Sequence, residues 1–589
     1  MSAQLNSGSA EVSSHAEASG NAEAPGRTAA ERFLQTLADR GVEHLYVGAG
    51  TDTAPIIEAY SRQPQSGLDF PKPVLAAHEN LAVGMAHGYY MVSGRPQAVM
   101  LHVSVGAANA VCGLMNAARS QVPMFFTAGR TPLFESGALG ARDSTIHWGQ
   151  EMFDQAGMVR EFMKWDYELR DGRNLVDVVD RGLSMAMAPP RGPVYLTLPR
   201  EVLGGAADDG PMPAMSAVPS LPHPMPQDVR KLAAALAVAR FPVIVCTASG
   251  ADPQTLPLLT QLADRFGIAV VEASPRFVNF PDKHPLHLGF DPDRVLPQAD
   301  AMLFLECDVP WIPSRGGPAP DAFVAHAGVD PSFSRYPVRT FRSDLSLTTD
   351  VAALLTALVG ELAAAGADRT QAARRAHGVE LASTLRQAVQ AGARAEDERG
   401  GPISKAYLSR CLDQVRDRDA LVVNEYPLLR PQMSFEQPGG YFLVSTAGGL
   451  GWGLPAALGA QQAEPDRQVI AALGDGSYFF CNPAACHHAA AMHGLPVLTV
   501  IFDNGGWDAV EKAALSMYPD SHAAEAARGG QRVPLSSLHP IPDFTLYAQA
   551  SGGHGERVDR REALIPALQR AAAFVRKERR QALVHVVGA

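Results

Sequence analysis

The sequence predicts an α/β protein with three doubly wound domains, each a parallel sheet flanked by helices. Two observations predict this class. From Arg27 onward, short and nearly continuous apolar runs alternate with Gly turns and with segments of helical periodicity, which is typical of parallel strands covered by helices. At 589 residues, the chain is also too long for one hydrophobic core.

Composition divides the chain further. The first residues are Ser, Ala, Glu and Gly with almost nothing apolar, which predicts a disordered tail. Six prolines between Gly210 and Pro226 indicate a linker. The expected segments are a tail at 1–26, an N-terminal domain at 27–205, a Pro-rich linker at 206–226, a middle domain at 227–365, a helical linker at 366–400 and a C-terminal domain at 401–589.

Individual elements follow from the same patterns. In the N-terminal domain we expect strands at 44–47, 73–77, 97–103 and 123–128, and helices at 80–93 and 107–120. In the C-terminal domain we expect strands at 469–473, 497–502 and 582–587.

Charge and composition exclude several classes of protein. With 46% hydrophobic and 19% charged residues, the chain is an ordinary globular protein, and a net charge of −11 with a pI near 5.9 argues against a nucleic-acid partner. No apolar run is long enough to span a membrane, and the N-terminus lacks a secretory signal. Six cysteines scattered through apolar segments fit buried thiols, so we expect a cytoplasmic protein.

Two short motifs in the C-terminal domain each follow an apolar strand. Asp475 lies in a Gly-Asp-Gly-Ser sequence, and Asn504 lies in Asp-Asn-Gly-Gly after the next strand. The carboxyl ends of parallel strands meet at one edge of a sheet, where ligands bind. A carboxylate, an amide and a backbone carbonyl there suit Mg²⁺, and the glycines let backbone amides approach a phosphate. Either motif alone is an ordinary turn or loop; together they indicate a metal and diphosphate site.

This pair resembles the signature of the thiamine-diphosphate-dependent decarboxylase and acetolactate-synthase superfamily, and the resemblance covers nearly the whole chain after the tail. It implies that Mg²⁺ is bound by Asp475, Asn504 and the carbonyl of Gly506, although Asp503 replaces the first Asn of the family motif. The other implied cofactor-binding residues are Gly448, Leu450, Gly474, Gly476 and Ser477.

Leu450 and Gly448 belong to a Gly-rich run, 447–455. Leu450 matches the bulky residue that bends the cofactor in this family, and Gly448 matches a carbonyl that accepts from its amino group. A Gly-rich entry to a buried helix would explain the glycines but not the single large residue among them. The spacing is not that of a dinucleotide fingerprint.

The resemblance also implies three residues for the chemistry in the N-terminal domain. Glu79, between an apolar strand and an apolar helix, matches the catalytic glutamate that contacts the cofactor's aminopyrimidine; in isolation it would be a helix N-terminal acid. The Leu-His segment at 101–102 resembles benzoylformate decarboxylases, where this His is an acid–base group, and Thr51 matches their substrate-contacting serine. A hydrogen-bonded structural role is the alternative for His102.

Three departures leave the substrate open. The second active-site His of benzoylformate decarboxylases has no counterpart, since Pro310–Arg315 contains none. The diphosphate-anchoring hydroxyls are missing from the stretch 424–428. The segment 507–543, with Tyr518, His522 and His539, is long enough for a lid.

We therefore expect an enzyme that cleaves or forms a C–C bond next to a carbonyl, by decarboxylation of a 2-oxo acid or carboligation. The alternatives are an acetolactate-synthase-like synthase, a 2-hydroxyketone or 2-hydroxyacyl-CoA lyase, and a non-catalytic cofactor-binding paralogue. The resemblance implies thiamine diphosphate and Mg²⁺, with FAD or ADP in the middle domain left open. It further implies a small carbonyl substrate and a homodimer or homotetramer with active sites at the dimer interface.

Overall fold

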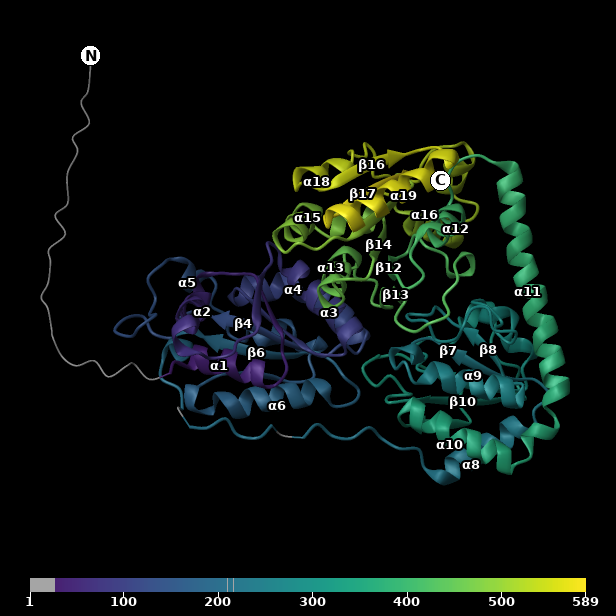
Figure 1. Ribbon diagram of the computed structural model, residues 1–589, viewed down its shortest axis with the longest axis horizontal. Helices are drawn as coiled ribbons and strands as arrows, with labels where there is room; N and C mark the ends of the chain where they lie inside the picture. Colours follow the sequence, from purple (N-terminus) through teal and green to yellow (C-terminus); the bar gives the residue numbers. More distant parts are fainter. Residues whose placement is uncertain (1–26, 209, 216) are drawn as a thin grey trace, which may run out of the picture.

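The computed structural model describes residues 27–208, 210–215 and 217–589, so the tail predicted at 1–26 lies outside the described residues. The chain forms three parallel sheets flanked by helices, and the predicted fold class is confirmed (Figure 1). In Figure 1 the N-terminal domain lies at the lower left, the middle domain at the lower right and the C-terminal domain at the top.

The N-terminal sheet has six parallel strands in the order β2-β1-β3-β4-β6-β5. Helices α1, α2 and α6 share a core on one face, and α3 and α4 pack on the other. The strands are β1 His44–Val47, β2 Lys72–Leu75, β3 Gln97–Leu101, β4 Met124–Arg130, β5 Asp166–Glu168 and β6 Val194–Pro199. The helices are α1 Ala29–Asp39, α2 Ala54–Ser66, α3 Glu79–Ser93, α4 Val103–Arg119, α5 Ile146–Gly149, α6 Leu175–Met187 and α7 Arg200–Gly204.

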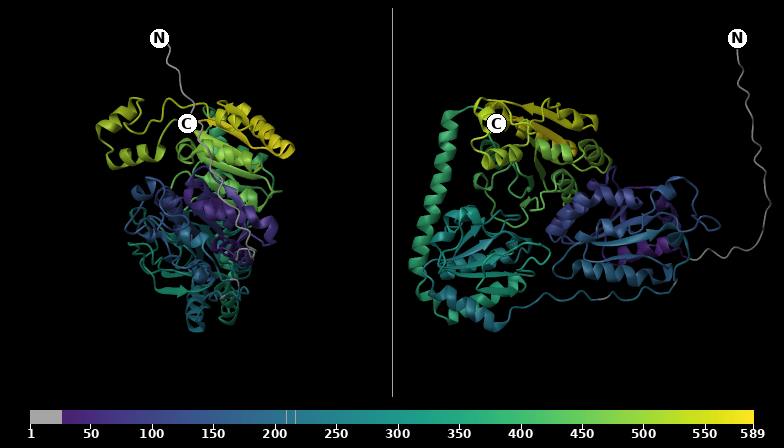
Figure 2. Two further views of the ribbon diagram at one scale, coloured as in Figure 1. Left: turned by 90° about the vertical axis from the view of Figure 1, so that its left-hand side faces the viewer. Right: turned by 180° about the vertical axis from the view of Figure 1, so that it is seen from behind.

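The middle sheet has five parallel strands in the order β11-β10-β9-β7-β8, with one continuous core. Its strands are β7 Pro242–Cys246, β8 Ala269–Glu272, β9 Ala301–Leu305, β10 Phe323–Gly328 and β11 Leu345–Thr348. Its helices are α8 Pro226–Val238, α9 Thr255–Phe266 and α10 Val351–Ala364. A long helix, α11 Gln371–Arg399, runs along the outside from the middle to the C-terminal domain (Figures 1 and 2).

The C-terminal sheet, β13-β12-β14-β15-β17-β16, repeats the strand order of the N-terminal sheet. Its strands are β12 Leu421–Glu425, β13 Tyr441–Leu443, β14 Val469–Gly474, β15 Leu498–Asp503, β16 His554–Val558 and β17 Ala582–Val587. Its helices are α12 Lys405–Val415, α13 Gly453–Ala463, α14 Asp475–Phe480, α15 Pro483–Met492, α16 Asp508–Met517, α17 His522–Arg528, α18 Thr545–Ala550 and α19 Arg561–Glu578.

One predicted strand boundary near the candidate site is wrong. The strand predicted at 97–103 ends at Leu101, and α4 begins at Val103 rather than at Ala107. Val103 has φ of +32°, which a strand residue does not adopt, so the chain turns directly from strand into helix. His102 is therefore the N-cap residue of α4 and not part of the strand.

Helices α3 and α13 occupy equivalent places in the two similar sheets and pack against each other in a shared core. Glycines make this packing possible. A Cβ at Gly88 would overlap the carbonyl of Ala456, and a Cβ at Gly459 would overlap the carbonyl of Met85. The two backbones therefore touch, and the N- and C-terminal domains form one packed body.

Two further sequence expectations concern membranes and thiols. Within the described residues, no helix combines the length and apolarity that a membrane span requires. The six cysteines are free, and all but Cys112 are buried.

Gly88→Ala is expected to destabilise the protein by about 1–3 kcal/mol or more, because the added methyl meets backbone that has no rotamer to change. The matched control is Gly360→Ala in the exposed part of α10, where a Cβ has nothing within 4 Å. Alanine there is expected to be neutral or to stabilise by up to about 1 kcal/mol. Thermal unfolding of both variants tests this. Equal melting temperatures would contradict the close backbone contact.

Candidate active site

At the carboxyl edge of the N-terminal sheet, His102 pairs with Asp52, a residue that no sequence motif indicated. Nδ1 of His102 lies 2.5 Å from Oδ1 of Asp52, whose side chain is only 3% exposed. The other carboxylate oxygen accepts a hydrogen bond from the amide of Val103, at 3.3 Å. The hydrogen bond to Asp52 raises the pKa of His102, burial opposes the rise, and the charge of Glu79 adds to it.

Glu79 begins α3 at the same edge of the sheet. Its carboxylate accepts a hydrogen bond from Asn109 Nδ2 at 3.2 Å and lies 3.9 Å from His78 Nδ1. The side chain is 22% exposed, so in the single chain this carboxylate is only partly buried. Asn109 and His78 flank Glu79 but leave part of it open to a ligand or to another subunit.

Thr51 lies in the 3₁₀ turn Thr51–Thr53 between β1 and α2, with its side chain exposed. Its neighbour Asp52 is the residue whose side chain turns inward to His102. Thr51 thus lies in the turn that carries this contact, while the contact to His102 comes from the next residue.

The Gly-rich run enters α13 over a buried acid. Glu425, at the end of β12, accepts hydrogen bonds from the amides of Gly451 at 2.7 Å and Gly453 at 2.6 Å. Desolvation raises its pKa to about 7, against the effect of these amides. Asn116 of α4 holds the same run from the other domain, because its Nδ2 donates to the carbonyl of Gly449 at 2.7 Å.

Within this run Gly448 is exposed, and Leu450 lies two residues further on. Gly448 has φ of +63°, a conformation that favours glycine, and a Cβ there would come within 3.6 Å of the Tyr426 hydroxyl. Leu450 is half-buried. Tyr426 itself has φ of +79° and stands where hydroxyl residues were expected. The Tyr426 hydroxyl therefore lies beside Gly448.

Three oxygen atoms converge at the carboxyl edge of the C-terminal sheet. Oδ1 of Asn504 lies 3.3 Å from Oδ2 of Asp475 and 2.9 Å from the carbonyl oxygen of Gly506. Without a cation between these oxygens the amide is better satisfied turned over, with its nitrogen donating to both Asp475 Oδ2 and the Gly506 carbonyl; a cation would favour the oxygen-facing orientation. A carboxylate, an amide and a carbonyl oxygen within this distance of one another are hard ligands of the kind that Mg²⁺ prefers. The donor set therefore fits the expected metal.

Asp475 is nearly buried, and desolvation together with the charge of Asp503 raises its pKa to about 6. Asp503, which replaces the family's asparagine, has its own partner, because His585 Nε2 lies 2.8 Å from its Oδ2. Burial acts to raise the pKa of Asp503, but the hydrogen bond with His585 lowers it overall. The negative charge thus rests first on Asp503, and a cation beside Asp475 would favour its ionised form as well.

Close packing surrounds the metal motif. A Cβ at Gly476 would overlap the indole of Trp507, whose ring also lies 5.6 Å from that of Phe480. Ser477 is buried, and its side chain contributes a hydrogen bond to Glu425. Gly474 is the N-cap residue of α14, and a Cβ there would have nothing within 4 Å.

The segment 507–543 leaves this edge and returns to it. Helix α16 has no buried residue, α17 has one, and both project from the body of the domain (Figure 2, left). The return passes the metal motif, because the amide of Leu538 donates to the carbonyl of Gly505 at 3.0 Å and Arg532 donates to the carbonyl of Asn504. Met517, Tyr518 and Leu535 are 70%, 60% and 93% exposed. The long segment is thus fixed at the site and open at its tip.

The candidate residues form two groups. Glu79, Asp52 and His102 meet at the edge of the N-terminal sheet, and Asp475, Asn504 and Gly506 meet at the edge of the C-terminal sheet. Within the described part of the chain, no hydrogen bond or ion pair joins one group to the other.

The crossover between the two halves of the metal motif carries two cysteines and two histidines. Cys481, Cys486 and His487 are buried, and His487 bonds Tyr478 at 2.8 Å and Gln581 at 2.6 Å. His488 is exposed.

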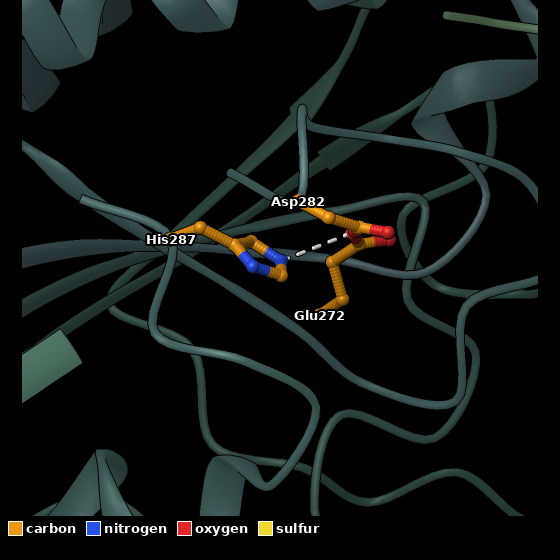
Figure 3. A group of neighbouring side chains, drawn as sticks. All are labelled: Glu272, Asp282 and His287. Atoms are coloured by element: carbon orange, nitrogen blue, oxygen red, sulfur yellow. Dashed lines mark hydrogen bonds and ion pairs between the residues drawn. The ribbon is translucent and has the colours of Figure 1, made fainter. Parts of the chain in front are cut away.

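A different group, Glu272, Asp282 and His287, brings its ligand atoms within 4.8 Å of one another (Figure 3). Its positive charge is supplied by Arg430 of the C-terminal domain, which pairs with both oxygens of Asp282 at 3.0 Å and lies 4.0 Å from Glu272. This group is an ion-pair network between domains, in which a metal would have to displace the guanidinium.

FAD or ADP in the middle domain was left open, and the first turn of that domain follows β7. Here the amide of Gly250 donates to Asn279 Oδ1 at 2.8 Å, and the Ser249 hydroxyl bonds the same atom at 3.1 Å. A pyrophosphate needs such amides free. In this structure the Gly250 amide is already bonded within the protein and is not free for a pyrophosphate.

Both domains that carry the candidate site residues are similar to domains of known proteins. The N-terminal TPP-binding domain of thiamine pyrophosphate enzymes matches residues 27–158, and their C-terminal TPP-binding domain matches residues 428–586. Benzoylformate decarboxylase of Pseudomonas aeruginosa is 27% identical over 575 residues, which cover 93% of this chain and 97% of that protein. Acetolactate synthase of Mycobacterium bovis is 25% identical over 568 residues, covering 93% and 86%.

Among solved structures, the thiamine diphosphate-dependent 4-hydroxybenzoylformate decarboxylase of Rhodococcus jostii shares the fold. The TM-score is 0.73 at 22% identity, over 95% of this chain and 99% of that one. The chain therefore belongs to the thiamine-pyrophosphate-dependent enzymes, in the family of the decarboxylases and acetolactate synthases. This confirms the family expected from its motifs.

Asp475→Ala is expected to weaken Mg²⁺-dependent binding of thiamine diphosphate by more than about 100-fold, since loss of a mere outer-shell partner already costs up to that much. Calorimetry with Mg²⁺ and the cofactor measures it. The control is Asp466→Ala, an exposed acid before the opposite end of β14. Unchanged affinity in Asp475→Ala would remove this residue from the metal site.

Proposed function

We propose that the protein uses thiamine diphosphate and Mg²⁺ to cleave or form a C–C bond next to a carbonyl, by non-oxidative decarboxylation of a 2-oxo acid or by carboligation. The observation that carries this proposal is the contact between His102 and Asp52: a partly exposed imidazole, at the same sheet edge as Glu79, has its pKa raised by its hydrogen bond to Asp52. Loss of CO₂ leaves a carbon that needs a proton, and His102 supplies one at neutral pH.

The residues divide the remaining work. Thiamine diphosphate, when bound, supplies an electron sink for the bond that breaks. Asp475, Asn504 and the Gly506 carbonyl would hold Mg²⁺ and, through it, the diphosphate. Gly448 and Leu450 would line the cofactor. Glu79, open on one side, exchanges a proton with the cofactor's pyrimidine ring.

The second candidate is a synthase or lyase that uses 2-hydroxyketones or acyl-CoA compounds. It is favoured by Pro310–Arg315, which brings no second histidine, and whose 3₁₀ turn Pro313–Arg315 is exposed. An acetolactate synthase among the relatives also supports it. A non-catalytic paralogue would bind the cofactor without turnover.

A panel of aromatic and aliphatic 2-oxo acids is expected to give CO₂ release with the wild-type protein. Glu79→Gln, which keeps the shape of the side chain but removes its charge, is expected to reduce turnover by about 100- to 10,000-fold while cofactor affinity stays unchanged. Coupled CO₂ detection and calorimetry measure the two. Turnover only with hydroxyketone or acyl-CoA donors would favour the second candidate, and no turnover with any donor would favour the paralogue.

We further infer that each active site uses two chains of a homodimer or homotetramer. The support is that the two groups of site residues stand at separate sheet edges, each bonded within its own domain. It also fits the partial exposure of Glu79.

Mixing two inactive variants tests this arrangement. After subunit exchange, Glu79→Gln and Asp475→Ala chains are expected to regain activity, because one of the two sites in a mixed dimer has both groups intact. A mixture of two Glu79→Gln preparations is the control. No regain after proven exchange would mean that each site is built from one chain.

A further inference from the structure

Asp52 has no assigned role, yet its environment is unusual for a carboxylate. Its side chain is 3% exposed, and within the described residues no arginine or lysine pairs with it. A buried carboxylate without a cation is costly. Its only ionisable partner there is the imidazole of His102, at 2.5 Å.

The fold makes room for this pair at two places. A Cβ at Gly50, beside β1, would overlap the imidazole of His102, and a Cβ at Gly129, in β4, would overlap the carboxylate of Asp52. Glycines from a loop and from a strand therefore stand on either side of one contact.

Backbone strain lies at the same point. Val103 is β-branched and has φ of +32°, a region that such residues rarely adopt. Its amide donates to the second oxygen of Asp52 at 3.3 Å. One carboxylate thus holds both the imidazole and the strained turn that places His102 at the sheet edge.

The pair leaves the second ring nitrogen of His102 available. Because Nδ1 donates to Asp52, a proton is exchanged at Nε2, which lies 3.4 Å from Gln150 Nε2. Oε1 of Gln150 is buried without a partner. Turned over, this amide would accept from Nε2–H, so Gln150 suits both protonation states of the ring.

We propose that Asp52 is the positioning residue of His102: it fixes the ring with Nδ1 protonated and Nε2 directed to the reacting group. The role rests on the proposed function, because it gives His102 an acid–base task. Other ionisable groups face the ring. Glu79 stands at the start of α3, His147 on α5, and Arg130 and Arg142 pair with Glu151 behind Gln150.

The contact with Asp52 determines the direction in which the pKa of His102 shifts. The hydrogen bond to Asp52, the largest cause, raises the pKa of His102, so the imidazolium persists to higher pH than for a free histidine. Asp52→Asn removes the charge and keeps the size. It is expected to lower that pKa by about one unit or more, and the basic limb of the turnover profile is expected to move to lower pH.

The first measurement needs no substrate. The Cε1–H resonance of His102, in protein with ¹³C-labelled histidine, is identified by its loss in His102→Ala and titrated in wild type and Asp52→Asn. A lower midpoint in Asp52→Asn supports the role, whereas an unchanged midpoint overturns it. Asp69→Asn, an exposed acid after α2, is the control and is expected to leave the midpoint unchanged.

The second measurement is a double-mutant cycle on turnover. Asp52→Asn is expected to slow wild type by about 100-fold or more, with KM and cofactor affinity unchanged, and to have no further effect in His102→Ala. An equal loss in both backgrounds would show a structural role and overturn the proposal. If the titration midpoint of His102 falls in Asp52→Asn as expected but His102→Ala is fully active, the acid–base task of the proposed function is refuted. The positioning contact between Asp52 and His102 then still stands.

Discussion

The backbone contact between α3 and α13 is the constraint on which the rest of the structure depends. Gly88 and Gly459 each meet a backbone carbonyl of the opposite helix, so the helices approach more closely than side chains would allow. The contact joins the N- and C-terminal domains into a single core. It therefore fixes the carboxyl edges of two sheets, and the residues they carry, relative to each other.

The two sheets have the same strand order but different chemistry at equivalent places. His102 follows β3, the third strand of its sheet in chain order, and Asp475 follows β14, the third strand of the other. In the proposed function, the N-terminal edge handles protons through Asp52, His102 and Glu79. The C-terminal edge offers oxygen ligands to a cation through Asp475 and Asn504. A duplicated frame thus carries two separate halves of a cofactor site.

Much of this could be predicted from the sequence, because its signals are local. Asp475 and Asn504 each follow an apolar strand directly, so a parallel sheet brings them together whatever the details. Asp52 was missed because its role depends on a contact between residues fifty positions apart. The end of β3 was misplaced because the φ of Val103 is set by its tertiary surroundings. Likewise, the exposure of Glu79 depends on neighbours in space and not on the apolar residues beside it in sequence.

The central claim is that one cofactor joins the N-terminal edge of one chain to the C-terminal edge of another. A crystal structure of the protein with thiamine diphosphate and Mg²⁺ tests it most directly. The account predicts the diphosphate and Mg²⁺ at Asp475, Asn504 and the Gly506 carbonyl, with the pyrimidine ring against Glu79 of a second chain and His102 beside the reacting carbon. A cofactor bound within a single chain, or one that leaves Glu79 and Asp475 uncontacted, would contradict it.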